Sequence, residues 1–270
     1  MSTSLTTPDG RGWLTEAFER YSSLWVVLLA CAVWQAAAAT GLLHNPAVPA
    51  PSAVLASLYR GMLERGHVLF FATLGTVLRL LLGYGIAVVF GGALGILAGR
   101  HPDFGAALNP LVALWIPLPA IVTIPVLSLW IGAGEAVIVL TVIFSAWIPV
   151  YLGALQGTRA ISVHQLWVMR SYRASAWREM RKVIVPGAFV NMIPSLRVGM
   201  GYAWRAVIAA EIIVQHGRGL GITIFAARQF FDVPTMYAGV ATIALLGLAL
   251  DHLVFPALER ATIRRWGLVS

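Results

Sequence analysis

The sequence predicts an all-α integral membrane protein with six transmembrane helices. The chain of 270 residues is 59% hydrophobic and only 11% charged, and its mean hydropathy is +0.81. Soluble domains carry about a quarter charged residues, so this chain would expose large apolar patches if it folded in water. Its single cysteine, Cys31, also excludes a scaffold held together by internal disulfides.

Six apolar runs are long enough to form the spans, because an α-helix needs about 20 apolar residues to cross the hydrocarbon core. The expected spans are residues 24–43, 70–99, 108–131, 136–155, 189–214 and 236–255. Prolines at positions 46, 49 and 51 end the first run, and the weakly amphipathic segment 52–64 is expected to lie on the membrane surface. Residues 24–256 thus form one membrane domain, flanked by an N-terminal tail, residues 1–23, and a C-terminal tail, residues 257–270.

The distribution of basic residues predicts the orientation. If the N-terminus is cytoplasmic, the inner segments carry Arg11, Arg20, Arg100, Arg159, Arg170, Arg173, Arg178, Arg181, Lys182, Arg260, Arg264 and Arg265. The outer segments carry only Arg60, Arg65, Arg218 and Arg228. This positive-inside bias places both termini in the cytoplasm. The formal charge of +8 therefore reflects membrane topology, and no nucleic-acid partner is expected.

The second span carries a small residue at every fourth position. The stripe consists of Gly83, Ala87, Gly91, Gly95 and Gly99. Such a stripe lets another helix approach closely. The pattern fits packing within the chain, and it also fits an interface with another subunit or with a moving helix.

Prolines at positions 117, 119 and 125 interrupt the third span. Each removes a backbone donor and frees a carbonyl group, which a bilayer tolerates only where protein or water covers the gap. Pro117 and Pro119 are therefore predicted to border a pathway for a solute; the alternative is a kink with no direct role.

Ionisable residues at membrane depth are costly and usually face the bundle interior or a cavity. Those in the second and fifth spans are Arg79, Arg197, Arg205 and Glu211. Arg197 is expected to extend to the cytoplasmic interface. Arg205 could line a path for an anion or pair with an acid or carbonyl groups elsewhere, and both interpretations stay open. Arg79 and Glu211 are further candidates for the pathway.

The segment 156–188 is too long and too regular for a simple connector. Apolar and basic residues alternate in it at helical spacing, which predicts two short amphipathic helices around a bend at residues 173–175. Ser175 is the expected N-cap of the second helix, and Pro186 ends the segment. The pattern fits a helix on anionic lipid as well as one that binds a cytoplasmic protein.

This segment also carries a family resemblance. Residues 165–178 and 183–188 resemble the coupling loop of permeases in bacterial binding-protein-dependent ABC importers, which typically reads Glu-Ala-Ala, three residues, Gly-Ala, and later an aliphatic residue and Pro. Further similar stretches are residues 49–52, 73–83, 116–119, 130–135, 196–199, 203–211, 219–221, 258–260 and 265–266. Their order and spacing resemble the branch that takes up nitrate, bicarbonate, taurine and aliphatic sulfonates.

The resemblance implies a type I importer permease in the bacterial inner membrane that carries a small oxyanion or sulfonate. It also implies a second permease copy, most simply a homodimer, two cytoplasmic ATPase subunits that hold ATP and Mg, and a periplasmic solute-binding protein. No cofactor is then expected on this chain. The residues implied in ATPase coupling are Leu166, Trp167, Met169, Arg170, Tyr172, Arg173, Ala174, Ser175, Trp177 and Pro186.

The loop departs from the family pattern at four positions. Trp167 and Met169 stand where the family has Glu and the second Ala, and Val190 stands where a second Pro is common. Arg173 replaces the usual Gly, which serves a tight bend. Docking to the ATPase is therefore expected to differ in detail while the general role is kept.

Two other classes of function fit the sequence less well. A secondary transporter or channel driven by an ion gradient would predict inverted repeats and several buried acids, but only Glu211 and Asp251 are candidates and no repeat is visible. An intramembrane enzyme needs a convergent catalytic set, yet the six histidines are scattered without metal-ligand spacing. The only lysine, Lys182, lies outside any phosphate-binding loop, so ATP hydrolysis is expected on another chain.

Overall fold

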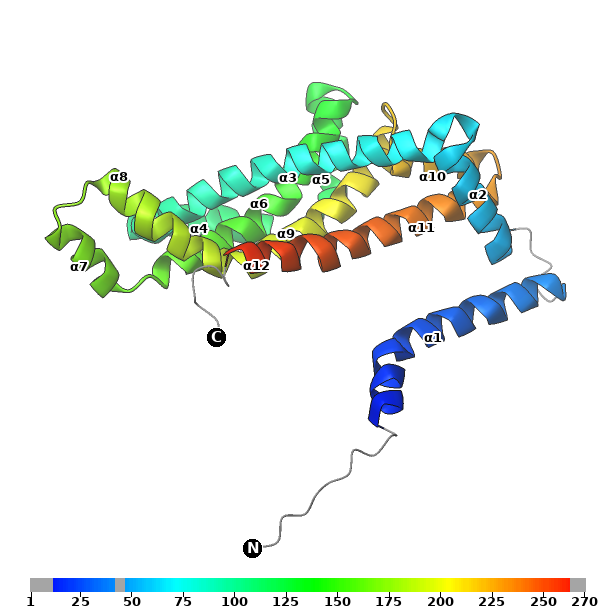
Figure 1. Ribbon diagram of the computed structural model, residues 1–270. Coiled ribbons are helices and arrows are strands. Elements are labelled where there is room, and N and C mark those ends of the chain that lie inside the picture. Colours follow the sequence, from blue (N-terminus) through cyan, green and yellow to red (C-terminus); the bar gives the residue numbers. More distant parts are fainter. Residues whose placement is uncertain (1–11, 42–46, 263–270) are drawn as a thin grey trace, which may run out of the picture.

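The computed structural model describes residues 12–41 and 47–262, and every regular element in them is helical (Figure 1). In chain order the elements are α1 (Gly12–Ala39), α2 (Pro51–Leu63), η1 (Arg65–His67), α3 (Val68–Arg100), α4 (Pro102–Trp115), α5 (Ala120–Ile131), α6 (Glu135–Arg159), α7 (Val163–Ser171), α8 (Ala176–Glu179), η2 (Met180–Ile184), α9 (Val185–Val214), α10 (Leu220–Gln229), α11 (Val233–Ala249), η3 (Leu250–Val254) and α12 (Phe255–Thr262). The element η1 is a 3-10 helix, whereas η2 and η3 are π-helices. The predicted all-α class is confirmed for these residues.

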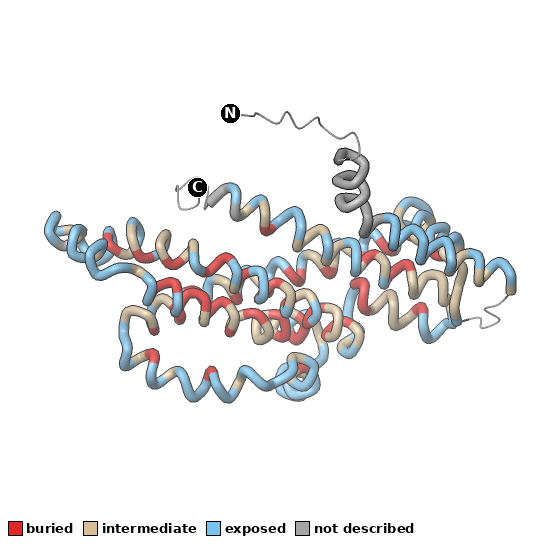
Figure 2. Tube along the Cα trace, turned by 90° about the horizontal axis from the view of Figure 1, so that it is seen from below, coloured by how far each residue is buried: buried red, intermediate tan, exposed pale blue. Residues whose placement is uncertain are grey.

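The centre of the molecule is a packed layer of α3, α6 and α9. Their facing sides supply most of the largest apolar cluster, with Val142, Ala146 and Val150 of α6 fully buried. Figure 2 shows the buried residues gathered along these central helices, while the segments at the ends of the molecule are largely exposed. In the view of Figure 1, α7 and α8 lie at one end of the layer and α2 and α10 at the other.

The small-residue stripe of α3 faces α6 of the same chain. A Cβ atom added to Gly91 would lie 2.5 Å from the carbonyl oxygen of Trp147, and one added to Gly99 would lie 2.6 Å from Cβ of Thr158. Such distances leave no room for a side chain, so the two helix backbones touch through the glycines. Of the two interpretations of the stripe, packing within the chain is confirmed.

Within residues 12–41 and 47–262, four helices are long and apolar enough to cross a membrane: residues 68–100, 135–159, 176–214 and 233–258. The pair α4 and α5 passes the same test only as one broken span, bent by 98°. The first expected span contains a shorter apolar helix, residues 25–39, and its last two residues lie outside the described part of the chain. The structure thus gives four or five spans by length, and the count of six stays a prediction.

The third span expected at residues 108–131 is broken at its prolines. The helix ends at Trp115 and a new helix begins at Ala120. Pro117 and Pro119 lack backbone donors and disfavour helical backbone in the residues before them, and Pro119 itself is extended at ψ 136°. The prolines therefore produce a sharp turn that brings residues 116–119 back towards α6 and α9.

Two shorter helices flank the central layer at the end opposite α7. The amphipathic segment expected at residues 52–64 is the helix α2, although its place on a membrane surface stays a prediction. The helix α10 was not expected, because residues 215–235 lie in the outer loop between the fifth and sixth expected spans. It begins at Leu220 after the left-handed turn at Gly217, and it packs against α9 and α11.

Candidate functional site

Residues 163–179, called here the α7–α8 segment, form two short helices joined by a tight bend. Ser175 caps the second helix, since its Oγ accepts a hydrogen bond from the backbone N–H of Arg178 at 3.4 Å. Arg173 stands in the bend with φ 49°, in the left-handed region that costs a non-glycine residue about 1–2 kcal/mol. The two helices, the bend and the cap predicted from the sequence are thus confirmed, and Arg173 keeps the backbone turn for which a glycine is usual. The predicted end at Pro186 is wrong, because residues 176–214 form one continuous helix in which the π-helix η2 runs directly into α9.

The α7–α8 segment exposes three large aromatic side chains. Trp167, Tyr172 and Trp177 are 64%, 81% and 73% exposed, and they come from both sides of the bend. Leu166 and Met169 are half-buried. Exposed Trp and Tyr clusters are typical of the centres of protein interfaces. The segment therefore has the surface of a docking element.

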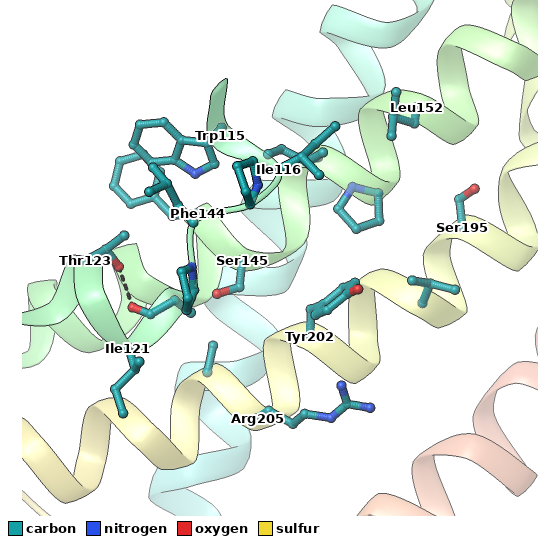
Figure 3. Close-up of a pocket in the computed structure, with 18 of the residues that line it drawn as sticks. Trp115, Ile116, Ile121, Thr123, Phe144, Ser145, Leu152, Ser195, Tyr202 and Arg205 are labelled. Atoms are coloured by element: carbon teal, nitrogen blue, oxygen red, sulfur yellow. Dashed lines mark hydrogen bonds between the residues drawn. The ribbon is translucent and has the colours of Figure 1, made fainter. Parts of the chain in front are cut away.

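A cavity of about 790 Å³ lies between the break of the third span, α6 and α9. Its walls are largely apolar, and among the predicted pathway residues it is lined by Pro117, Pro119 and Arg205. Figure 3 shows Thr123 on α5, Ser145 on α6 and the side chains of Tyr202 and Arg205 on α9 around this space. The turn forced by the prolines is thus what forms one wall of the cavity.

Two of the polar side chains that line the cavity have partners within their own helices. The hydroxyl groups of Thr123 and Ser145 donate to backbone carbonyl oxygens of their own helices, at 2.7 and 2.8 Å. The guanidinium group of Arg205 lies 5.9 Å from the ring centre of Tyr202 and contacts no carboxylate in the described part of the chain. An exposed cation on an apolar wall is suited to a small anion.

Arg79 and Glu211 lie elsewhere, in a buried polar cluster that joins α3, α6 and α9. Arg79 Nη1 donates to Glu211 at 2.7 Å, and its Nε and Nη2 donate to the two oxygens of Glu135 at 2.6 and 2.5 Å. The same guanidinium group donates to the carbonyl oxygens of His216 and Arg218 at 3.0 and 2.9 Å. All its donor directions are therefore used within the protein.

The carboxylate of Glu211 is fully buried and equally well satisfied. It accepts hydrogen bonds from Thr76 Oγ1 and from the backbone N–H of Gly221, each at 2.9 Å. Thr76 Oγ1 in turn accepts one from the N–H of Leu220 at 2.9 Å. The cluster thus fixes the start of α10 to α3 and α9. The structure brings Arg79 and Glu211 together but places neither in the wall of the cavity, and their role in a pathway stays a prediction.

Two further ion pairs were not found from the sequence. Arg197 donates to both oxygens of Asp251 at 2.5 and 2.6 Å, which links α9 to η3. Arg100 Nη1 donates to Glu179 at 2.8 Å, which links the end of α3 to the α7–α8 segment. A signal for the second pair was present, because Glu179 is the only acid in residues 156–188. No group of three metal-ligating side chains occurs within the described ranges.

Comparison with known proteins adds a family match to this geometry. Residues 91–261 match the model of the family described as binding-protein-dependent transport system inner membrane component. The matched region contains the cavity, the α7–α8 segment and Glu211.

Curated relatives cover most of the chain. The taurine transport system permease protein of Escherichia coli is 30% identical over 84% of this chain and 83% of its own length. The putative aliphatic sulfonates transport permease protein of Bacillus subtilis is 27% identical, over 86% and 83%. The bicarbonate transport system permease protein of Synechococcus elongatus is 29% identical, over 77% and 72%.

A solved structure has a similar fold. The inward-facing MetNI methionine ABC transporter contains a chain that superimposes with a TM-score of 0.59 at 16% sequence identity. The match covers 72% of this chain and 96% of the other. At that identity the comparison supports the fold of the helical layer and says nothing about the solute.

Proposed function

We propose that this chain, which belongs to the family of inner-membrane components of binding-protein-dependent transport systems, is the permease subunit of an ATP-driven importer of a small oxyanion or sulfonate. The family membership is shown by the match over residues 91–261 and by the similarity to the taurine, sulfonate and bicarbonate permeases. The proposal rests on one observation: two distinct surfaces lie at different places on the same packed helices. One is the cavity with Arg205, and the other is the exposed aromatic surface of the α7–α8 segment.

In this proposal the cavity is part of the solute pathway, completed by a second copy of the chain. The apolar wall at Pro117 and Pro119 excludes strongly hydrated cations, and the guanidinium group of Arg205 attracts the anion. A nitrate, bicarbonate, taurine or alkanesulfonate molecule would be delivered by a periplasmic binding protein. Both chain termini and the α7–α8 segment then face the cytoplasm of a bacterial cell, as the basic residues predict.

The α7–α8 segment is proposed to dock into an ATPase subunit that holds ATP and Mg. Trp167, Tyr172 and Trp177 provide the aromatic anchors for such an interface. Closure of the two ATPase subunits on ATP would push the segment and convert the pathway from inward-open to outward-open. The segment continues through η2 into α9, which also carries Arg205, so docking and pathway share one continuous helix.

The double substitution Ser175→Glu/Trp177→Glu is expected to abolish co-purification of the ATPase subunit with the tagged permease. It removes the cap and places charge on a 73% exposed aromatic surface, so the interface loses its anchor. The measurement is the molar ratio of ATPase to permease after affinity purification. Phe230→Glu is the matched control. Phe230 is an aromatic residue that is 82% exposed, but it lies at the C-terminal end of α10 and not in the α7–α8 segment. Wild-type recovery of ATPase with the double variant would contradict the docking role.

Arg205→Gln is expected to lower the initial rate of anion uptake by about tenfold or more, since a charge-assisted hydrogen bond contributes roughly 1.5–3 kcal/mol. Uptake of labelled taurine, an alkanesulfonate and bicarbonate is measured in cells that express the complete importer. Arg228→Gln serves as the control, because it removes an exposed positive charge outside the cavity lining. Normal uptake of all three solutes by Arg205→Gln would refute the assignment.

A further inference from the structure

The ion pair of Arg100 and Glu179 joins the α7–α8 segment to a transmembrane helix other than the one that follows it. Arg100 Nη1 lies 2.8 Å from Glu179 Oε1, and the two side chains are 25% and 7% exposed. We propose that this pair is a transmission contact: it makes α3 move with the α7–α8 segment when the ATPase pushes that segment. The inference rests on the docking role proposed above and assigns Arg100 and Glu179 as positioning residues.

The environment of Glu179 differs from that of its neighbours. Trp177 is 73% exposed and Arg178 is also exposed, whereas Glu179 is only 5% exposed. The next residues form the π-helix η2, whose wider turn changes the direction of side chains relative to an α-helix, and such turns are frequent at functional sites. A buried carboxylate is stable only with a charged or hydrogen-bonding partner. Glu179 is therefore directed into the protein, and α3 supplies a partner.

Arg100 is held at a fixed position on the other side of the pair. It is the last residue of α3, and the preceding Gly99 packs against Thr158 of α6 without space for a Cβ atom. The end of α3 thus packs directly on α6, and a shift of one helix along the other would disturb this contact. A force on Glu179 therefore acts on the joined pair of α3 and α6, and not on a loose side chain.

Other contacts of the α7–α8 segment are sparse. Among the described helices, α8 packs mainly on η2, which is its own continuation towards α9, and α7 has only isolated helix contacts. The ion pair thus connects the α7–α8 segment directly to α3. Little other packing connects the segment with this helix.

The helix α3 can carry a displacement to the opposite end of the layer. It has 33 residues and is therefore about 50 Å long. The stripe of small residues holds residues 83–99 of α3 against α6, and Arg79, four residues before the stripe, belongs to the cluster with Glu135 and Glu211. A shift at Arg100 therefore reaches the residues that fix the start of α10. Without the pair, the segment can move with α9 alone.

The test uses the full-length permease assembled with its co-purifying ATPase subunit. A single reporter cysteine, Ser195→Cys in the cavity wall, is combined with Cys31→Ser, which removes the only native cysteine. The ratio of maleimide labelling rates with and without ATP plus vanadate measures how far the cavity responds to the ATPase. ATP hydrolysis is measured on the same samples.

Arg100→Gln and Glu179→Gln are expected to keep the ATPase bound and ATP hydrolysed, while the ATP-dependent change in labelling falls about fivefold or more, the lower end of typical coupling factors. Arg100→Lys and the exchange Arg100→Glu/Glu179→Arg are expected to restore most of the change, because each keeps an opposite-charge pair. Arg181→Gln and Asp103→Asn are charge-matched controls at exposed positions nearby and should match the wild type.

An unchanged labelling response in both single variants would overturn the proposal. If these variants do not assemble, Glu179→Asp decides, because it keeps the charge but shortens the reach to Arg100. A reduced response with bound ATPase then supports the transmission contact, and a wild-type response overturns it. If instead the wild-type permease bound no ATPase, or if its labelling did not change with ATP, the proposed function itself would be refuted.

Discussion

Replacing Arg79 by leucine is expected to destabilise the folded protein by about 3–5 kcal/mol, the usual cost of removing one partner from a buried ion pair. Arg79 is 7% exposed, and Glu211 is fully buried. Without the guanidinium group, Glu211 keeps only the donors of Thr76 and Gly221 and remains a charge in an apolar interior. The carbonyl oxygens of His216 and Arg218 lose their donor at the same time. The measurement is the temperature at which the detergent-solubilised protein loses its monodisperse peak.

The three charged members of the cluster are expected to differ in a definite order. Glu211→Gln should cost less than Arg79→Leu, because Arg79 would keep Glu135 and two carbonyl oxygens as partners. Glu135→Gln should cost least, because the side chain of Glu135 is 51% exposed and water can replace part of its interaction. Equal losses for all three, or the largest loss for Glu135→Gln, would contradict this account of the cluster.

The double variant Arg79→Leu/Glu211→Leu provides a further check. Removing both charges leaves no buried ion without a partner, so the double variant is expected to be more stable than the sum of the two single losses predicts. This non-additivity arises because a buried charge without a partner lowers the stability more than the absence of both charges does. Additive losses would show that the two side chains act independently.

The sequence predicted those features of the backbone that depend only on residues adjacent in the chain. The bend at residues 173–175, its cap at Ser175 and the disruption at Pro117 and Pro119 all follow from preferences of a few consecutive residues, and they are present in the structure. The direction of the break was beyond such reasoning, because the 98° angle depends on how α5 packs against α6 and α9.

Partners distant in sequence could not be predicted in the same way. Arg79 and Glu211 are separated by 132 positions, and Arg100 and Glu179 by 79. Each of these residues was visible as an ionisable group in or beside an apolar run, but hydrophobic periodicity carries no information about which helix lies opposite. The helix α10 was missed for a related reason, since its ten residues are stabilised by packing on α9 and α11 and by the polar cluster at its start.

Gly95→Ala, the addition of one methyl group to the stripe on α3, is expected to destabilise the protein by about 1–3 kcal/mol, as overpacking of a well-packed interior does. The new Cβ would collide with the carbonyl oxygen of Tyr151 and would lie 2.6 Å from Cβ of Ala154. Neither atom belongs to a flexible side-chain end, so the two helices must separate. Gly95→Leu should prevent accumulation of folded protein, because the larger side chain adds to the same collision.

Gly85→Ala is the matched control on the same helix. Nothing lies within 4 Å of a Cβ atom added at Gly85, so the substitution keeps the packing and gains the higher helix propensity of alanine. The comparison of the two alanine variants by thermal loss of the monodisperse peak separates the effect of close helix approach from the effect of replacing a glycine. If Gly95→Ala were as stable as Gly85→Ala, α3 and α6 could not be in contact through their backbones, and α3 could not transmit a displacement as one body with α6.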